Sequence, residues 1–161
     1  NEIKDYLELI PIRDNKSKLK IWIKFEVGNL FQLLMLDTRS IYRDKQLNIE
    51  DYFDGNSINK SKYKRDLSVD RKLIGLEQML WIKNNLNKKF KWSIIGQQVL
   101  LAQVYLPTIF ANMNKKILPD YLHKYLKIGG ANVPYNTDAW DGYPKERERL
   151  FKVLKKYVDQ I

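Results

Sequence analysis

The stretch "KLKIWIKFEVGNLFQLLMLD", residues 18–37, decides the fold. Its first ten residues alternate with a period of two, which predicts a strand with one buried face. The buried set is Leu19, Ile21, Ile23, Phe25 and Val27, and the set facing solvent is Lys18, Lys20, Trp22, Lys24 and Glu26. "GN" at residues 28–29 predicts a two-residue hairpin loop that takes positive φ angles. The nearly continuous apolar run at residues 30–37 then predicts a second strand that is covered on both faces.

A helix and another buried strand follow this hairpin. Residues 75–86, "GLEQMLWIKNNL", carry apolar side chains at helical spacing. These side chains are Leu76, Met79, Leu80, Ile82 and Leu86. Residues 91–102, "KWSIIGQQVLLA", predict a buried strand with Gly96 inside it or at its end. Strand, helix and strand in this order form a βαβ unit with parallel strands and a right-handed crossover, so the predicted fold class is α/β.

Two polar excursions leave this framework, at about residues 41–70 and 104–141. Within the first, "NKSKYKRD" at residues 59–66 reads as a solvated loop, and within the second, residues 116–126 predict a short helix. Pro144 suits the first position of a final amphipathic helix, and Glu146 and Glu148 suit the positive end of its dipole. Its apolar stripe is Leu150, Phe151, Leu154, Tyr157, Val158 and Ile161.

The composition of the 161 residues excludes several classes of protein. A hydrophobic content of 44% is typical of one globular domain, and no apolar run is long enough to span a membrane. Without cysteine and with His123 as the one histidine, the chain forms no disulfide and no zinc site with several histidines. The net charge of +10 is compatible with nucleic-acid binding, but the lysines are spread along the whole chain, as a compositional bias produces.

Ligands of open α/β sheets bind at the carboxyl ends of the strands, and two predicted strand ends carry polar residues. Asp37 and Arg39 follow the first parallel strand, either as an ion pair or turn cap, or as active-site residues with Arg39 as a bidentate phosphate contact. Gln97 and Gln98 lie at the end of the second. Their amide oxygens either ligate a hard cation such as calcium or satisfy backbone groups.

A third candidate segment is "TDAWDGYPKERERL", residues 137–150, which closes the second excursion. Trp140, Asp141 and Tyr143 either line a lid over the strand-end edge, or serve the fold. In the second reading Trp140 and Tyr143 anchor the loop on the core while Asp141 caps the helix.

Four segments in order resemble one family. "YLELIPIR" (6–13), "FEVGNLFQLLMLDTRSIYRD" (25–44), "LIGLEQMLWIKNNLNKKFKWSIIGQQVLLA" (73–102) and "WDGYPKERERLFKVL" (140–154) are similar to the PhoD-like alkaline phosphatases, also called phosphodiesterase/alkaline phosphatase D. The resemblance implies part of the calcineurin-like metallophosphoesterase sandwich, two packed sheets flanked by helices. Gln97 or Gln98 stands where the wider superfamily has a metal-binding histidine, and PhoD-like members also lack that histidine.

The family's main ligand motifs, a "DDHE"-like segment and a late "GDxH" segment, are not among these residues. We therefore expect residues 1–161 to form a single incomplete domain that needs the remaining segments of the same enzyme and is inactive alone. The resemblance implies a metal-dependent phosphatase or phosphodiesterase, calcium and iron as metal ions, a phosphoester substrate and a secreted or cell-surface location. The alternative is a basic, non-catalytic module that binds nucleic acid or another anionic surface.

Overall fold

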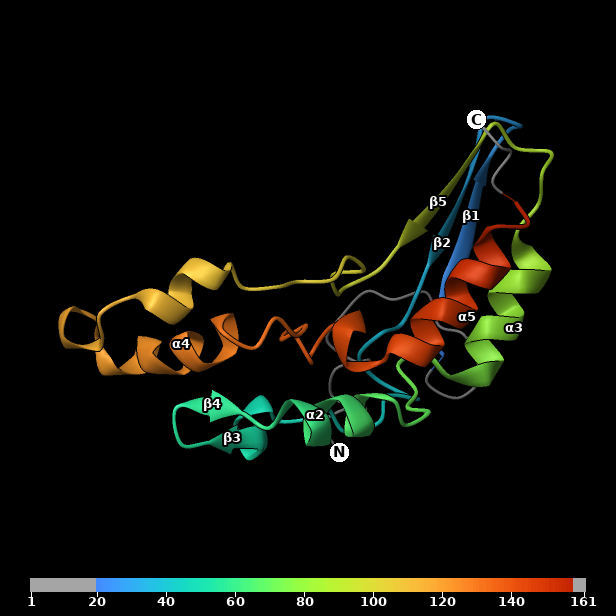
Figure 1. The fold of residues 1–161 in the computed structure, drawn as a ribbon. Helices are drawn as coiled ribbons and strands as arrows, with labels where there is room; N and C mark the ends of the chain where they lie inside the picture. The colour runs from blue at the N-terminus through green and yellow to red at the C-terminus, as the bar shows by residue number, and fades with distance from the viewer. Residues whose placement is uncertain (1–19, 158–161) are drawn as a thin grey trace, which may run out of the picture. The chain divides into compact units, whose positions relative to one another are not determined.

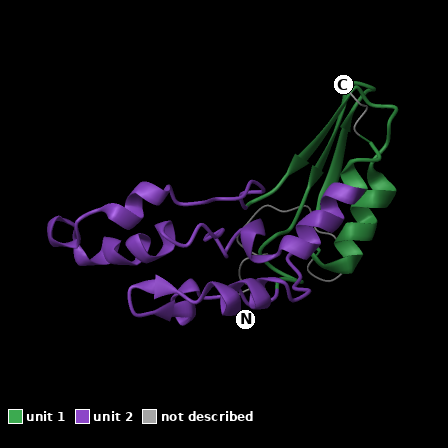
Figure 2. Cartoon of the chain, viewed as in Figure 1, with its two compact units in different colours: residues 1–43, 74–98, 153–161 green, residues 44–73, 99–152 purple. Residues whose placement is uncertain are grey.

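The computed structural model describes residues 20–157, which form two compact units (Figures 1 and 2). The first unit contains the described residues 20–43, 74–98 and 153–157, and the second contains residues 44–73 and 99–152. The two excursions expected from the sequence fall largely within the second unit. The expectation of a single incomplete domain stays a prediction, as does the strand at residues 18–19, which lies outside the described residues.

The first unit is built on a three-stranded sheet with the order β1-β2-β5. Strands β1 (Ile23–Val27) and β2 (Phe31–Met35) are antiparallel, and β5 (Trp92–Gly96) runs parallel to β2. Helix α3 (Gly75–Asn85) lies between β2 and β5 in the chain (Figure 1). The hairpin, crossover helix and parallel strand predicted from the sequence are therefore confirmed, although each strand is shorter than expected.

The hairpin loop contains three residues, 28–30, and not the predicted two. Val27 pairs with Phe31, and the Leu30 N–H donates to the Val27 carbonyl at 3.0 Å. Gly28 takes a φ of +51°, the left-handed conformation that glycine adopts without a steric penalty. The positive φ predicted for Gly28 is therefore confirmed. Asn29 does not take the positive φ that a two-residue loop requires.

The burial predicted for β1 and the residue before it is wrong. Trp22, expected to face solvent, is buried, whereas Phe25 and Val27, expected in the core, are exposed. In β2, Leu34 is fully buried but Met35 is exposed, so among residues 20–157 the strand is not covered on both faces. Alternation identifies the two faces of a strand, but it does not decide which face the rest of the chain covers.

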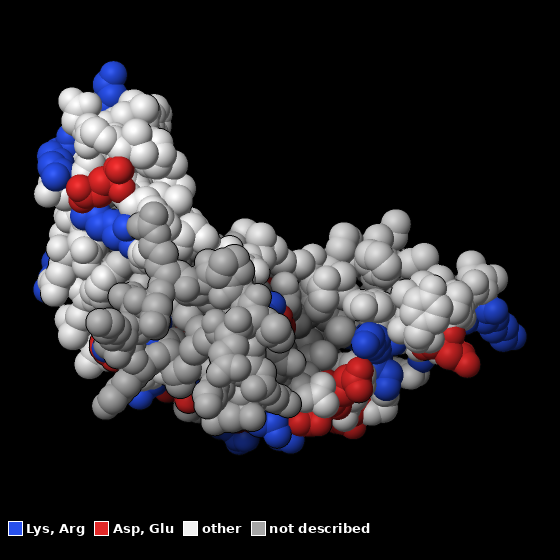
Figure 3. Space-filling model, turned by 180° about the vertical axis from the view of Figure 1, so that it is seen from behind, with Lys and Arg blue, Asp and Glu red and all other residues white. Residues whose placement is uncertain are grey.

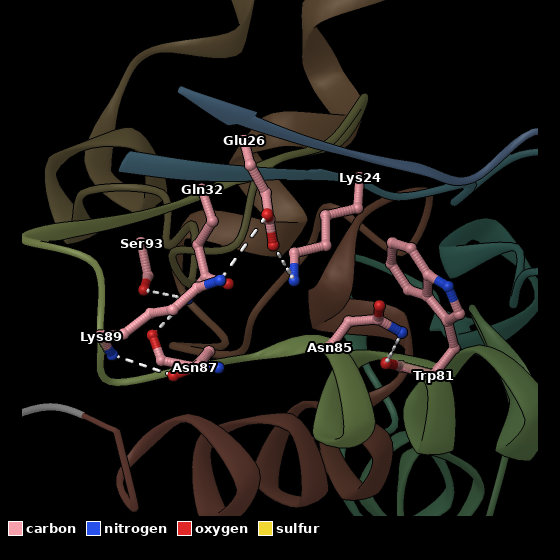
Figure 4. A network of polar contacts seen from close by, with 8 residues as sticks. All are labelled: Lys24, Glu26, Gln32, Trp81, Asn85, Asn87, Lys89 and Ser93. Atoms are coloured by element: carbon pink, nitrogen blue, oxygen red, sulfur yellow. Dashed lines mark hydrogen bonds and ion pairs between the residues drawn. The ribbon is translucent and has the colours of Figure 1, made fainter. Parts of the chain in front are cut away.

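The buried face of the sheet includes polar side chains with specific partners (Figure 4). Gln32, completely buried, donates through Nε2 to the Asn87 carbonyl at 2.9 Å and to Ser93 Oγ at 2.7 Å. Near it, Lys24 and Glu26 form an ion pair at 2.7 Å. Gln32 therefore joins β2 to β5 and to the segment that follows α3.

Helix α3 buries a different stripe from the predicted one. Met79, Ile82 and Leu86 are buried as expected, but Leu76 and Leu80 are exposed. The stripe is completed by Gly75 and Gln78. Gly75 has a φ of +73°, and a side chain there would meet the Tyr42 ring at 2.7 Å, so glycine is required where α3 begins.

The second unit begins with short elements that enclose a core of their own. Helix η1 (Ile49–Tyr52), strands β3 (Phe53–Asp54) and β4 (Ser57–Ile58), and helix α2 (Lys60–Leu67) follow one another. Residues 59–66, predicted as a solvated loop, are therefore helical. Asn59 is the N-cap of this helix, because its side chain accepts from the Lys62 N–H. The buried ring of Tyr63 packs edge-on against Tyr52 with 5.0 Å between centroids.

Later elements of the second unit are mostly single helical turns. They are η2 (Thr108–Asn112), η3 (Lys115–Ile117), η4 (Asp120–Leu122), α4 (His123–Gly129) and η5 (Trp140–Gly142). Helix α4 confirms the short helix predicted within residues 116–126, with His123 half-buried at its start. Ile128, Ala131 and Val133 pack into the core formed by Tyr52, Ile58, Tyr63 and Leu67.

The final helix, α5 (Pro144–Leu154), begins at Pro144 as predicted. Leu150 is fully buried, but Phe151 is exposed and Glu146 is buried. The Glu146 carboxylate accepts from the Leu73 N–H, so its partner is a distant backbone group and not only the helix dipole. Val158 and Ile161 of the predicted stripe lie outside the described residues.

The burial pattern of α3 leads to a stability prediction. Ile82→Ala should lower the free energy of unfolding by about 2–5 kcal/mol, because it leaves a cavity around a fully buried position. Leu76→Ala should lower it by less than about 0.5 kcal/mol, because this side chain is 69% exposed. Urea denaturation of both variants measures the difference. Equal losses would contradict the stripe described for α3.

Candidate functional site

The carboxyl end of β2 is held by the side chain of Gln78. This buried residue of α3 accepts from the Asp37 N–H through Oε1 at 2.7 Å and donates from Nε2 to the Asp37 carbonyl at 2.8 Å. The register of β1 with β2 would place Ile21 opposite Asp37, but β1 begins only at Ile23. The amide of Gln78 thus makes the pair of hydrogen bonds that a neighbouring strand makes in an antiparallel pair.

Gln98 holds the next residue from the other side. Its Oε1 accepts from both the N–H and the hydroxyl of Thr38, at 3.0 and 2.6 Å. The backbone ladder just before this point ends with Leu36 N–H donating to the Gly96 carbonyl at 2.8 Å. Two roles were considered for Gln98, and these bonds show that its side chain satisfies a backbone N–H group. Metal ligation by Gln97 or Gln98 stays a prediction.

Asp37 organises the turn that follows. Its Oδ1 accepts from the N–H groups of Arg39 and Ser40, both at 2.9 Å, which is the turn cap considered from the sequence. Its Oδ2 is buried without a hydrogen-bond partner. The Arg43 guanidinium donates to the Thr38 carbonyl at 3.2 Å. Arg39 is exposed on this fixed turn, and a catalytic role for Asp37 or Arg39 stays a prediction.

The described residues do not themselves assemble a metal centre. Within residues 20–157, no three His, Asp or Glu side chains gather closely enough to hold an ion. Among the candidate ligands at the end of β2, Asp37 has a buried Oδ2 without a hydrogen-bond partner, and Oε1 of Gln98 is already bonded to Thr38. Carboxylate and amide oxygens suit a hard cation, but two of them do not complete its coordination.

In the second unit, Asp141 ties the two ends of the second excursion together. Its carboxylate is buried and accepts from the Val104 N–H at 2.9 Å. The Arg147 guanidinium, on α5, lies 3.7 Å from Oδ1. Burial raises the pKa of Asp141, while the Val104 N–H and the charge of Arg147 act in the opposite direction. Asp141 bonds to the start of the excursion; its role as a cap of the final helix stays a prediction.

Trp140 and Tyr143 are both completely buried. The Tyr143 hydroxyl donates to the Asp44 carbonyl at 2.6 Å, and its ring lies under the Arg71 guanidinium, 4.9 Å from the centroid. Arg71 in turn donates to the carbonyls of Gly142 and Lys45. These contacts agree with the anchoring role considered for both aromatic residues. Their role in a lid stays a prediction.

Sequence reasoning missed Gln78 and Arg71, and it gave Glu146 only a role at the helix dipole. Gln78 carried a readable signal, because a glutamine between Ile74 and Ile82 at a spacing of four interrupts an apolar helical stripe. A polar residue in that position needs a partner in the core. The bonds of Arg71 to Gly142 and of Glu146 to Leu73 carried no local signal, since these partners lie 71 and 73 residues away in the chain.

Comparisons with known proteins identify a family and two relatives that this chain resembles. The family model described as PhoD-like phosphatase matches residues 2–160. Alkaline phosphatase D of Bacillus subtilis (strain 168) is 30% identical over 155 residues, which is 93% of this chain and 22% of that protein. A solved structure titled "Structure of PhoD" has a TM-score of 0.63 at 31% identity and covers 96% of this chain and 25% of its own.

The mixed sheet with its crossover helix, together with the likeness to the PhoD structure, places the chain among α/β proteins of the phosphoesterase type. The chain belongs to the PhoD-like phosphatase family, as the resemblance indicated. It spans about a fifth to a quarter of the length of these relatives, with 22% of one and 25% of the other.

The environment of Asp141 leads to a prediction of pH dependence. Above the ordinary pKa of 3.8 and below the raised pKa, the folded protein binds more protons than the unfolded chain. The free energy of unfolding should therefore fall as pH rises through this window. Asp141→Asn should remove this slope, and Arg147→Gln should extend the window upward because a neighbouring positive charge is lost. Urea denaturation at several pH values measures both effects.

Asp70 provides a control, because its pKa is shifted in the opposite direction from that of Asp141. The Arg149 guanidinium that hydrogen-bonds Asp70 lowers the pKa of this carboxyl, so its contribution to stability should be lost as pH falls. A slope that is unchanged in Asp141→Asn would show that the Asp141 carboxyl does not titrate abnormally.

Proposed function

We propose that this segment belongs to a metal-dependent phosphoester hydrolase and contributes a phosphate contact at the carboxyl end of β2. Membership of the PhoD-like phosphatase family supports the reaction class. The single observation that supports the position is the polar clamp on residues 37–38, made by Gln78 on one side and Gln98 on the other. A turn fixed in this way presents Arg39 at the sheet edge where α/β proteins bind ligands.

Arg39 is suited to a phosphate because its planar guanidinium donates two parallel hydrogen bonds to two oxygens. The backbone of the turn is already ordered by the bonds to Asp37 Oδ1, so binding a substrate requires little further ordering of the chain. Arg43, anchored to the Thr38 carbonyl, adds positive charge to the same turn. The turn thereby favours an anionic substrate over a neutral one.

The proposed enzyme would obtain its metal centre from the remaining segments of the same polypeptide. The resemblance implies calcium and iron; such ions polarise phosphoryl oxygens and lower the pKa of an attacking water. The described residues do not fit a complete metal site, so no step of the reaction is assigned to a metal here. Export to the cell surface belongs to the same proposal and rests on the resemblance alone.

A basic, non-catalytic module is the second candidate, and the net charge of +10 favours it. On the face drawn in Figure 3, however, Lys and Arg residues are interspersed with Asp and Glu and do not gather in one patch. No helix within residues 20–157 has the length and apolar character needed to cross a bilayer. DNA affinity that falls steeply with salt, without metal-dependent hydrolysis, would support the module over the enzyme.

The phosphate contact can be tested in the parent polypeptide that contains this segment. Arg39→Ala should lower kcat/KM for phosphate monoesters or diesters roughly 10- to 100-fold, because hydrogen bonds between charged groups contribute about 1.5–3 kcal/mol. Arg39→Lys should recover part of the loss, since it keeps the charge but not the planar fork.

Arg65→Ala is the matched control, because the Arg65 side chain is 72% exposed on α2 and its ion pair is with the adjacent Asp66. Its kinetics and the metal content of all variants should equal those of the unchanged enzyme. Unaltered kinetics in Arg39→Ala would remove Arg39 from the site. A parent polypeptide without metal-dependent hydrolysis would overturn the function itself.

A further inference from the structure

The second unit contains a small cavity, which we call the second-unit cavity. Its volume is about 160 Å³. Residues 56–58 and 60 line it together with residues 111, 126–127 and 130–131, so segments from both excursions meet there. All of these residues belong to the unit that Figure 2 draws in purple. The turn at residues 37–43 contributes nothing to the lining, so the cavity is separate from the strand-end site.

Part of the cavity wall is apolar and belongs to the core of the second unit. Ile58 of β4, Leu126 of α4 and Ala131 line the cavity and are all buried. Helix α4 packs closely on η2, because a Cβ at Gly129 would lie only 2.8 Å from Cβ of Phe110. The packing of the unit thus forms this wall without a ligand. A preformed apolar wall suits a short hydrocarbon group.

Two lysines that line the cavity contact only neutral groups among residues 20–157. Nζ of Lys60 donates to the Gly130 carbonyl at 3.4 Å, which is a long hydrogen bond. Nζ of Lys127 lies 4.7 Å from the centroid of the Phe53 ring, in a cation–π contact. Neither contact involves a carboxylate, and no acidic residue lines the cavity. The positive charge of both ammonium groups is therefore available to an anion.

A third lysine contacts the wall of the cavity from η3. Nζ of Lys115 donates to Oδ1 of Asn56 at 2.6 Å, and Asn56 lines the cavity. Because Oδ1 already accepts this bond, the Nδ2 group of Asn56 is the part of the amide that donates to a ligand. Three ammonium groups thus lie at the cavity or next to it. Their charge attracts an anion and repels a metal cation.

We propose that the second-unit cavity binds a small organic anion, which has a phosphate-type group and a short apolar chain. The ammonium groups of Lys60 and Lys127 donate charge-assisted hydrogen bonds to its oxygens. The apolar wall contacts the chain. The volume of about 160 Å³ is several times the roughly 30 Å³ that a water molecule occupies, so the ligand is a small molecule and not a polymer. The inference does not rest on the proposed function, because the cavity shares no residue with the strand-end turn.

Isothermal titration calorimetry of the parent polypeptide with propylphosphonate tests the proposal. This probe has a phosphate-type group and a short apolar chain, and its C–P bond is not the ester bond that a phosphoester hydrolase cleaves. Lys60→Gln and Lys127→Gln should each weaken one binding event roughly 10-fold or more, because each substitution removes a charged hydrogen-bond donor. Arg39→Ala should leave this event unchanged, which separates it from binding at the strand-end turn.

Lys124→Gln is the matched control, because Lys124 lies on α4 like Lys127 but pairs with Glu50 and does not line the cavity. Its affinity should stay within about twofold of that of the unchanged protein. Equal weakening by Lys124→Gln and Lys127→Gln would overturn the proposal, since it would show attraction to a positive surface in general. Equal affinities in all variants would overturn it as well.

Ala111→Leu tests the cavity itself, because it narrows the space and leaves every charge in place. This variant should also weaken the binding of propylphosphonate, and full affinity in it would contradict binding inside the cavity. None of these measurements requires hydrolytic activity, so a failure of the proposed function would leave their outcome unchanged.

Discussion

The amide of Gln78 is the interaction on which the organisation of the first unit depends. The β1 strand begins too late to pair with Asp37, so the N–H and carbonyl of this residue need partners from elsewhere, and Gln78 supplies both from the first turn of α3. The helix is thereby attached to the end of β2 by directional bonds, and hydrophobic packing of Met79 and Ile82 adds to them. The cost of burying an amide is offset because its groups are bonded, whereas an apolar side chain there would leave two buried backbone groups without partners.

The second unit applies the same physical rule at a longer range. Residues from three distant segments exchange hydrogen bonds between side chains and backbone: Tyr143 with Asp44, Glu146 with Leu73, and Asp141 with Val104. Long excursions of irregular backbone contain many polar groups that regular structure does not satisfy. Buried side chains near the start of α5 satisfy them, and this explains why "WDGYPKE", residues 140–146, combines two large aromatic residues with two acidic ones. The segment orders the two excursions from within their own unit.

The regular elements were predictable because their signals are local. Period-two alternation gave the hairpin, helical spacing gave α3, and Pro144 marked the first residue of α5. The burial of Trp22 and the exposure of Phe25 and Val27 were not predictable, because alternation is symmetric and the choice of the buried side depends on what packs there. Helix α2 was missed because its lysines suggested a solvated loop, although Asn59 is a good N-cap. The strand-end residues Asp37 and Gln98 could be located from the sequence, but their bonds to Ser40 and Thr38 depend on the tertiary structure.

The proposed function therefore depends on a strand end that is fixed before any ligand arrives. A rigid turn is what a phosphate contact at Arg39 requires, since misplacement by about 1 Å can remove much of its benefit. Amide hydrogen exchange at residues 36–38 tests this most directly. The Leu36 amide, bonded to the Gly96 carbonyl, is the internal reference for the sheet. We predict that the amides of Asp37 and Thr38, bonded to the two glutamine side chains, exchange within about tenfold of Leu36. Exchange of both amides at the rate of an unstructured peptide, with Leu36 protected, would contradict it.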